Sequence, residues 1–558
     1  MKTILSIYWM AAVSLALYSC GKKSSAPDPE PPPAPKNFNI SSWVISGLVS
    51  QTVNYGVPAT TAVRLTFPAA IDRSTVAANI QLTENSGSPV NYTATYEKSD
   101  SIVIITAVQP LANIAKYKVS VKGQLKSTNG GHIINPVDIT MVTAIDSSRK
   151  FPAITDDALL TLVQQQTFKY FWDFGHPVSG LARERNSSGD IVTSGGSGFG
   201  IMAIVVAVNR NFVTRTEGLQ RVQKIVTFLK NTAQRFHGAF PHWLNGSTGA
   251  VVPFSTKDDG ADLVETAYLM QGLLAARQYF NGADAAETAL RTDINSLWNA
   301  VEWDWFRQGN QNVLYWHWSP NFNWDMNHQI KGWNECLITY VLAASSTTHA
   351  IPKMVYDNGF AANGAIKNNN AYYGINLPLG EPYGGPLFFA HYSFLGINPH
   401  DLTDTYANYW DQNKNHSLIN NKYCITNSNN YFGYSDSCWG LTASDIPNGY
   451  AASSPLNDLS VIAPTAALSS FPYTPTESMK ALKFFYYVLG DKLWKQYGFT
   501  DAFSLHNTWF ADSFLAIDQG PIIIMMENYR SGLLWNLFMS CPEVKTGMTA
   551  LGFQSPNL

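Results

Sequence analysis

Charged residues are scarce in this sequence: Asp, Glu, Lys and Arg make up 14% of the 558 residues, and the formal net charge is −3. Because there is no basic excess, the chain lacks the electrostatic attraction that nucleic-acid phosphates need, and no nucleic acid is expected as a partner. Hydrophobic residues account for 45%, which excludes a disordered chain. The length is sufficient for two or more domains.

Cysteine is rare as well. After Cys20, only Cys336, Cys424, Cys438 and Cys541 follow, which is too few for a disulfide scaffold. Cys424 and Cys438 lie in one loop rich in Asn, Gly, Ser and Tyr, and their spacing leaves open whether they pair. Because no Cys-x-x-Cys motif or His-rich cluster is present, we expect no structural metal.

Long apolar runs are absent except at residues 4–17. This run is shorter than the roughly 20 residues of a membrane-spanning helix, and it ends in Leu17-Tyr18-Ser19-Cys20, so it predicts a signal peptide over residues 1–20. The ending resembles a lipobox with Cys20 as the lipidated N-terminus, although Tyr18 is unusual there; an ordinary signal peptide cut nearby is the alternative. We therefore expect a secreted protein, lipid-anchored in the cell envelope and attached to the membrane only by that anchor.

Two segments with different patterns follow the signal. Residues 21–38 are rich in proline and predict an extended linker. Residues 39–146 contain short β-branched runs broken by Gly, Pro, Asn and Asp, and about seven such runs predict a small Ig-like β-sandwich. Its turn Phe67-Pro-Ala-Ala-Ile-Asp72 resembles one that recurs in bacterial Ig-like domains. A spacer role is favoured over sugar binding, because no predicted strand carries a cluster of exposed aromatic residues.

A helical period of 3.6 replaces the alternating pattern from residue 152 to 555 and predicts an all-α domain. Paired helices joined by long loops favour an (α/α)6 toroid. An α-solenoid is the alternative, but no fixed repeat supports it. We expect helices over residues 158–174, 198–208, 217–234, 261–280, 285–301, 332–344, 478–489 and 521–538.

The strongest local signal is a group of carboxylates in Lys257-Asp-Asp-Gly-Ala-Asp-Leu-Val-Glu-Thr266. If a helix begins near Asp259, then Asp258, Asp262 and Glu265 lie on one face of it. The helix is otherwise apolar, so these carboxylates are expected to face a polar cavity, because unpaired burial costs several kcal/mol. The alternatives are that Asp258 caps the helix and that Asp262 and Glu265 each serve in a structural salt bridge.

Two further carboxylates stand beside apolar helices. Glu335 follows Trp333 and Asn334, where desolvation is expected to raise its pKa, as a general acid requires. The alternative is a hydrogen-bonded Glu335 at a helix start. Asp518 comes directly before the apolar helix that begins at Pro521. Each of these two carboxylates is therefore a candidate for acid or base chemistry.

Tryptophan is concentrated in the predicted helical domain, where 14 of the 16 lie. Within Tyr315-Trp-His-Trp-Ser319, a loop segment, Trp316, His317 and Trp318 are predicted to stack on or bond to pyranose rings. Simple packing of loops is the alternative for about half of the tryptophans. The glycines of residues 195–200 favour close helix packing over phosphate binding, because no strand precedes them and no Lys-Ser/Thr follows. No Gly-x-Ser-x-Gly motif supports a serine esterase.

Residues 155–553 resemble glycoside hydrolase family 144, the endo-β-1,2-glucanases. The resemblance rests on motifs at residues 195–200, 236–243, 257–266, 313–320, 332–336, 386–394, 438–445, 463–475 and 517–521. It implies an (α/α)6 fold, no metal or cofactor, and inverting hydrolysis of β-1,2-glucan. It also implies that Asp258, Asp262, Glu265 and Glu335 match the family's acidic positions, with Asp518 as the best match for the remaining one. The substrate-binding candidates are Phe254, Trp316, His317, Trp318, Trp333, Asn334, His391, Tyr392 and Trp439.

An inverting mechanism assigns roles to these residues. Inversion needs a protonated carboxyl and an ionised carboxylate, usually about 6.5–9.5 Å apart. We assign the acid to Glu335 and the base to Asp518, because neighbours on one helix, such as Asp262 and Glu265, lie only about 5–6 Å apart. Asp258, Asp262 and Glu265 are then expected to hold sugar hydroxyls and tune charge.

The mode of action stays open at this point. Endo or exo cleavage depends on whether loops such as residues 364–384 and 427–433 close one end of the cleft. An exo-acting, sophorose-releasing hydrolase is therefore one alternative. A glucan-binding lipoprotein without activity and a transglycosylating enzyme are alternatives from other classes. We expect the protein to be a monomer with a β-glucan substrate.

The first prediction concerns the membrane anchor. Cys20→Ser removes the only residue expected to carry lipid, so the protein should move from the membrane fraction to the soluble fraction. Cell fractionation followed by immunoblotting measures this. A substituted protein that still sediments with membranes contradicts the lipobox.

Overall fold

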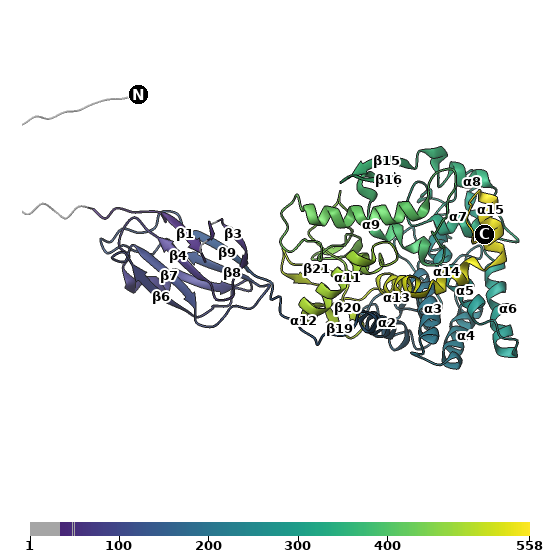
Figure 1. Ribbon diagram of the computed structural model, residues 1–558, viewed down its shortest axis with the longest axis horizontal. Coiled ribbons are helices and arrows are strands. Elements are labelled where there is room, and N and C mark those ends of the chain that lie inside the picture. Colours follow the sequence, from purple (N-terminus) through teal and green to yellow (C-terminus); the bar gives the residue numbers. More distant parts are fainter. Residues whose placement is uncertain (1–33, 47, 50) are drawn as a thin grey trace, which may run out of the picture.

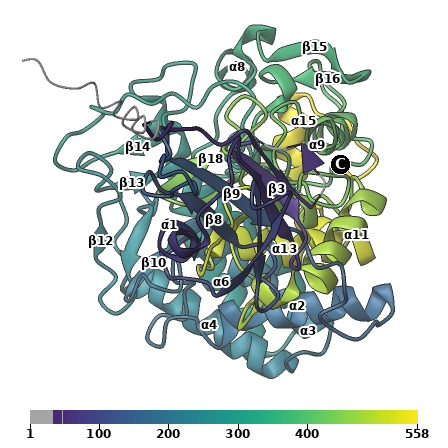
Figure 2. The same ribbon diagram turned by 90° about the vertical axis from the view of Figure 1, so that its left-hand side faces the viewer.

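The structure, a computed structural model, describes residues 34–46, 48–49 and 51–558, so the predicted signal peptide and Cys20 lie outside the described residues. A β-sandwich and a larger, mainly helical domain follow one another along the long axis of the molecule (Figure 1). Viewed along that axis, the sandwich lies in front of the helical domain (Figure 2). Among the described residues, no helix has both the length and the apolar character needed to cross a membrane.

The sandwich consists of two sheets, as the alternating pattern predicts. One sheet has the order β2(Leu48–Val49), β1(Ser42–Ile45), β4(Ala62–Thr66), β7(Ile102–Ala107), β6(Tyr92–Glu97). The other has the order β3(Val53–Val57), β9(Val137–Thr143), β8(Lys116–Val121), β5(Ile80–Glu84). All pairs are antiparallel except β3 with β9. Residues two apart, such as Val103 and Ile105 on β7 or Val119 and Val121 on β8, fill the core between the sheets.

The second domain is built from α-helices of very different burial. The helices are α2(Asp156–Trp172), α3(Ser194–Asn209), α4(Arg215–Asn231), α5(Leu263–Tyr279), α6(Ala285–Asn299), α7(Leu337–Ser345), α8(Lys353–Asn358), α9(Tyr409–Thr426), α10(Pro464–Leu468), α11(Pro475–Lys483), α12(Gly490–Leu493), α13(Ala516–Ser531), α14(Leu533–Met539) and α15(Pro542–Leu551). Helices α3 and α5 are buried along almost their whole length, whereas α4 and α6 bury one face only. Apolar helices thus form the interior and amphipathic helices cover it.

Short strands between the helices shape one end of this domain. Beyond the helical pattern, the structure contains a three-stranded sheet of β10(Ile191–Thr193), β11(Trp243–Asn245) and β12(Val251–Val252), together with the pairs β13(Ala261–Asp262)/β14(His317–Trp318), β15(Lys367–Tyr372)/β16(Ile375–Leu379), β17(Ala443–Ile446)/β18(Gly449–Ala452), β19(Trp494–Lys495)/β20(Gly498–Phe499) and β21(Phe503–Ser504)/β22(Trp509–Phe510). The strict helical period expected to residue 555 is therefore wrong in detail.

Several predicted helix boundaries are also wrong. The helix expected over residues 521–538 begins at Ala516 and is divided at Gly532, whose φ of 70° ends α13 before α14 starts. Helix α9 was not predicted, because its buried face carries polar residues such as Asn413 and Asn420. Helix α7 begins at Leu337, so Glu335 precedes the helix.

The glycines of residues 195–200 allow close helix packing, as predicted. A Cβ atom at Gly198 would lie 2.2 Å from the carbonyl oxygen of Tyr268, and one at Gly272 would lie 2.2 Å from that of Gly198. Helices α3 and α5 therefore approach each other through glycine on both sides.

The four described cysteines are buried free thiols, and Cys424 and Cys438 do not pair. Both lie in the core beneath α9 to α11. The open question of their pairing is answered: in this structure they pack as small apolar side chains.

Candidate active site

Asp262 is fixed at the start of α5. Its Oδ1 accepts hydrogen bonds from the backbone N–H groups of Val264 and Glu265 at 3.0 and 2.9 Å, so Asp262 is the N-cap. The expectation that the helix begins near Asp259 with Asp258 as its cap is wrong, because Ala261 and Asp262 pair with Trp318 and His317 as strand β13. Asp258 therefore lies in the preceding turn and not on a helix face.

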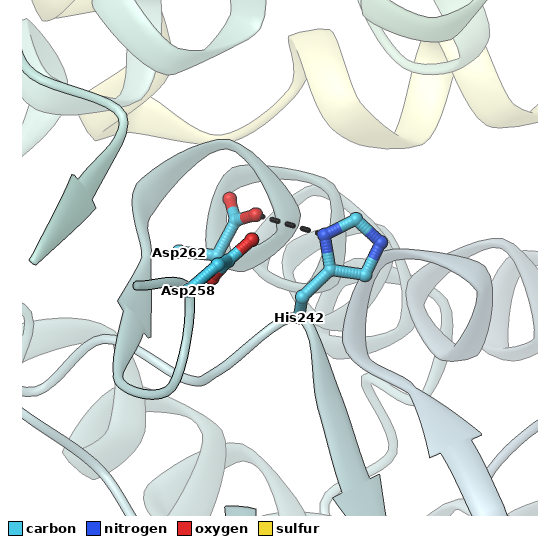
Figure 3. A group of neighbouring side chains, drawn as sticks. All are labelled: His242, Asp258 and Asp262. Atoms are coloured by element: carbon cyan, nitrogen blue, oxygen red, sulfur yellow. Dashed lines mark hydrogen bonds and ion pairs between the residues drawn. The ribbon is translucent and has the colours of Figure 1, made fainter. Parts of the chain in front are cut away.

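Two histidines lie beside the aspartates, and Figure 3 shows one of them, His242, with Asp258 and Asp262. His242 Nδ1 lies 3.0 Å from Asp262 Oδ2, and His317 Nε2 lies 3.5 Å from Asp258 and 3.7 Å from Asp262. Burial raises the pKa of Asp258 to about 7, with a further contribution from the charge of Asp262. Burial opposes ionisation of Asp262 too, but the hydrogen bond from His242, the histidine charges and the Glu265 backbone N–H together outweigh burial and hold the pKa of Asp262 below its usual value.

The two histidines differ in charge. Burial lowers the pKa of His242, but the carboxylates Glu265 and Asp262 outweigh that effect and raise the pKa to about 9. Burial lowers the pKa of His317 to about 4. At neutral pH, His242 is therefore an imidazolium and His317 is neutral.

Glu265 extends from the first turn of α5 to the N-terminus of α3. Its Oε2 accepts hydrogen bonds from the Gly195 backbone N–H at 2.7 Å and from the Thr193 hydroxyl at 3.1 Å. A Cβ at Gly195 would lie 2.6 Å from this oxygen, so glycine is required there. The alternative of a structural salt bridge holds for Asp262, which pairs with His242 at 3.0 Å, whereas Glu265 is held by hydrogen bonds from Gly195 and Thr193.

Glu335 precedes α7 and is held by its backbone. The Glu335 carbonyl accepts hydrogen bonds from the Ser393 hydroxyl and, at 3.4 Å, from the Tyr268 hydroxyl. Burial, with smaller contributions from the charges of Asp262 and Glu265, raises the pKa of the Glu335 carboxyl to about 7. The carboxyl group therefore holds its proton near neutral pH, as the sequence predicts for a general acid.

Asp518 lies in the first turn of α13, paired with a carboxylate that the sequence analysis missed. Its side chain hydrogen-bonds to that of Asp501, and each residue is 2% exposed. Burial raises the pKa of Asp501 to about 7 and the pKa of Asp518 well above its usual value. Two buried carboxylates in contact cannot both ionise, so the pair shares a proton.

A cavity of about 280 Å³ opens beside these groups. Its lining includes Thr193, His242, Trp243, Phe254 and Tyr450. The half-exposed Phe254 ring stacks on His242 at 4.2 Å between centroids. This arrangement fits the expected sugar-binding role of Phe254, since an exposed aromatic face covers the apolar face of a pyranose.

Not all predicted substrate-binding residues lie beside the carboxylates. Tyr392 does: it is buried, and the charges of Asp518, Glu335 and Glu265 add to the effect of burial in raising the pKa of its hydroxyl. Trp316 stacks on His317 at 5.6 Å.

The remaining candidates pack within the protein. Trp318 joins Trp305 and His237 on the opposite face of β14 from His317, and Asn334 accepts a hydrogen bond from the Cys336 backbone N–H. The other three are buried. Trp333 packs against the ring of Phe394, and His391 hydrogen-bonds to the Ser470 hydroxyl. The indole N–H of Trp439 donates a hydrogen bond to the Glu477 carbonyl.

The functional residues that the sequence reasoning missed are His242, Thr193, Asp501 and Tyr450. His242 was inside a quoted motif, Phe236-His-Gly-Ala-Phe-Pro-His-Trp243, so a signal existed. No signal existed for Asp501, because its partner Asp518 is recognised only when loop and helix come together.

An aromatic cavity beside carboxyl groups of unequal protonation defines a carbohydrate-active site of the glycoside hydrolase class. The family model described as "Putative glucoamylase" matches residues 327–542, and one for a bacterial Ig-like domain matches residues 44–143. A solved "putative glucoamylase" from Bacteroides uniformis is 56% identical, covers 73% of this chain and 100% of its own, and has a TM-score of 0.72.

Two characterised relatives are also similar. An endo-β-1,2-glucanase from Chitinophaga pinensis, solved with sophorotriose and glucose, is 54% identical over 73% of this chain and 100% of its own, with a TM-score of 0.71. An exo β-1,2-glucooligosaccharide sophorohydrolase from Parabacteroides distasonis is 47% identical over 424 residues, which is 72% of this chain; the chain spans 58% of the length of that relative. The chain thus belongs to the "Putative glucoamylase" family, glycoside hydrolase family 144, as its motifs predict.

The second prediction concerns metal binding. Ligand atoms of His242, Asp258 and Asp262 lie within 4.8 Å of one another, which is close enough to hold a cation. We expect none to bind, because protonated His242 already supplies positive charge and its Nδ1–H points to Asp262. Thermal unfolding with EDTA and with added divalent cations tests this. A cation that raises Tm in the wild type but not in His242→Gln contradicts the prediction.

Proposed function

We propose that this protein hydrolyses β-1,2-glucan by an inverting, acid/base mechanism, in the manner of an endo-β-1,2-glucanase. The observation that carries the proposal is the contrast in protonation within one site: Glu335 keeps its proton near neutral pH, whereas Asp262 is ionised. The names of the two characterised relatives support the substrate, because both act on β-1,2-linked glucose.

Glu335 is the general acid in this proposal. Its proton passes to the glycosidic oxygen as the bond to the anomeric carbon breaks. Burial maintains the raised pKa of Glu335, and the Tyr268 hydroxyl donates a hydrogen bond to the Glu335 backbone carbonyl at 3.4 Å.

The Asp501–Asp518 pair is the general base. A water molecule attacks the anomeric carbon from the opposite face and gives its proton to the pair, which holds one negative charge when it shares one proton. Asp518 alone is a poorer base than the sequence suggests, since the contact with Asp501 keeps it protonated. The base role therefore belongs to both residues.

Of the carboxylates Asp258, Asp262 and Glu265, one is assigned to binding the sugar and two to holding the site in shape. Both oxygens of Asp262 are engaged, by the α5 backbone and by His242, so Asp262 orients its neighbours. Glu265 accepts a hydrogen bond from the Gly195 backbone N–H in the first turn of α3, so it too has a supporting role. Asp258 Oδ1 has no hydrogen-bond partner in the described protein although it is buried, and it is the atom we assign to a sugar hydroxyl.

Endo cleavage is favoured over exo cleavage. The loop at residues 427–433, one of those considered as a barrier, packs away from the cavity: Phe432 stacks on Tyr55 of the sandwich at 5.6 Å. The lining of the cavity beside His242 comes from other segments. Exo release of sophorose, transglycosylation, and glucan binding without catalysis remain the alternatives that product analysis separates.

The wider proposal includes architecture and location. Buried α3, α5 and α13 with amphipathic α4 and α6 outside are consistent with the inner and outer helices of an (α/α)6 toroid. The linker at residues 21–38 and the lipobox at Cys20 favour a monomer tethered to the cell envelope.

The third prediction concerns the substrate. Purified protein should release mixed oligosaccharides from linear β-1,2-glucan and little or no glucose from starch, because the site is assigned to β-1,2-linkages. A reducing-end assay and chromatography of the products measure this. A single disaccharide product indicates exo action, chain lengthening indicates transfer, and glucose from starch alone overturns the substrate.

The fourth prediction concerns the acid and the base. Glu335→Gln and Asp518→Asn should each lower kcat by about 10²–10⁴-fold, the usual effect of losing an acid or base. Product anomers followed by NMR should be inverted. Activity should fall as pH rises through about 7, where Glu335 loses its proton.

The pH profile of kcat also tests the role of the Asp501–Asp518 pair. Ionised Asp501 raises the pKa of Asp518, so Asp501→Asn should shift the acidic limb of kcat to lower pH. Glu97→Gln, on β6 of the sandwich, is the matched control and should leave the profile unchanged. Retained anomeric configuration, or an Asp501→Asn profile identical to wild type, contradicts the mechanism.

A further inference from the structure

A second cavity adjoins the one beside His242. Its volume is about 610 Å³, within the range of about 300–1,000 Å³ that ligand sites show. Arg185 and Tyr450 line both cavities, so the two are adjacent. Tyr450, on the hairpin of β17 and β18, is 45% exposed and stands at the junction. A chain leaving the first cavity in this direction enters the second.

The charge of the shared wall favours a neutral ligand. Arg185 Nε lies 3.0 Å from Glu184 Oε2, and its Nη1 lies 3.1 Å from Asp445 Oδ1. Two carboxylates therefore exceed one guanidinium by one negative charge, and the nearby Asp512 adds a further one. An anionic polymer is repelled here, whereas hydroxyl groups find both donors and acceptors.

Trp509 supplies an aromatic surface on this wall. It lies on β22, is partly exposed, and makes no ring contact with another aromatic residue among the described ones. The adjacent Phe510 differs, because it packs against Phe503 in the core. An indole that lines a cavity without packing on other rings is suited to stack on a pyranose.

The Ig-like domain holds the hairpin that carries Trp509. His506, between β21 and β22, stacks on Tyr55 at 4.5 Å, and its Nε2 lies 2.9 Å from the Tyr55 hydroxyl. The Phe432 backbone N–H donates to the other ring nitrogen at 3.3 Å. Figure 1 shows β21 on the side of the helical domain that faces the sandwich. The sandwich therefore fixes one wall of the second cavity.

We propose that the cavity lined by Trp509 is a distal subsite for a neutral glucan chain, and that the Ig-like domain positions its wall through Tyr55 and His506. This inference rests on the proposed function, since the same chain occupies both cavities. It assigns the sandwich a part in substrate binding by way of the helical domain and not through a sugar site of its own.

The fifth prediction tests the subsite by chain length. Trp509→Ala should lower the ratio of kcat/KM for long β-1,2-glucan to that for a β-1,2-linked trisaccharide by about 5–10-fold, the order of one lost stacking contact. Trp509→Phe, which keeps a ring, should recover most of the ratio. Tyr55→Ala should lower it by a smaller factor, because it loosens the hairpin from outside the cavity.

Matched controls and direct binding complete the experiment. Tyr529→Ala removes an exposed aromatic residue near the far end of α13 and should leave the ratio unchanged. Calorimetry on Glu335→Gln with and without Trp509→Ala measures the Kd for long glucan independently of turnover. Equal Kd values overturn the subsite, and a Tyr55→Ala ratio equal to wild type overturns the role of the Ig-like domain. Absence of hydrolysis by the wild type, with the Kd still dependent on Trp509, overturns the proposed function alone.

Discussion

The contact between α3 and α5 is the constraint on which the site depends. Glycine at 198 and at 272 lets the two backbones approach so closely that a methyl group on either would overlap a carbonyl oxygen. This approach brings Glu265 onto the N-terminus of α3, where backbone N–H groups and the helix dipole favour a negative charge. Asp262 in turn caps α5. The orientation of both carboxylates thus follows from one packing contact.

Burial sets the charges within the site. Asp262 is ionised because His242 and the α5 backbone donate to it, whereas Glu335 is buried with no cation beside it among the described residues to offset burial and keeps its proton. Asp518 shares its environment with Asp501, so protonation belongs to the pair. The acid, base and binding roles that we propose for these carboxyl groups depend on such differences in environment from one group to the next.

The two domains cooperate through a small aromatic contact. Tyr55 of the sandwich stacks on both Phe432 and His506 of the helical domain, and the Phe432 backbone N–H donates to His506. Aromatic stacking combined with a hydrogen bond fixes the relative position of two loops at little entropic expense, since each ring has few rotatable bonds. The hairpin of β21 and β22 is therefore held from outside its own domain, which a mere spacer would not do.

The sequence by itself determined the elements whose signals are local. Alternation predicted the sandwich, apolar periodicity predicted buried α3 and α5, and desolvation beside Trp333 predicted a raised pKa for Glu335. Only the tertiary structure decided which residue caps α5, that α9 forms despite its polar face, and that Asp501 meets Asp518. These features depend on strand pairing and on contacts between segments distant in sequence, and no local pattern records such contacts.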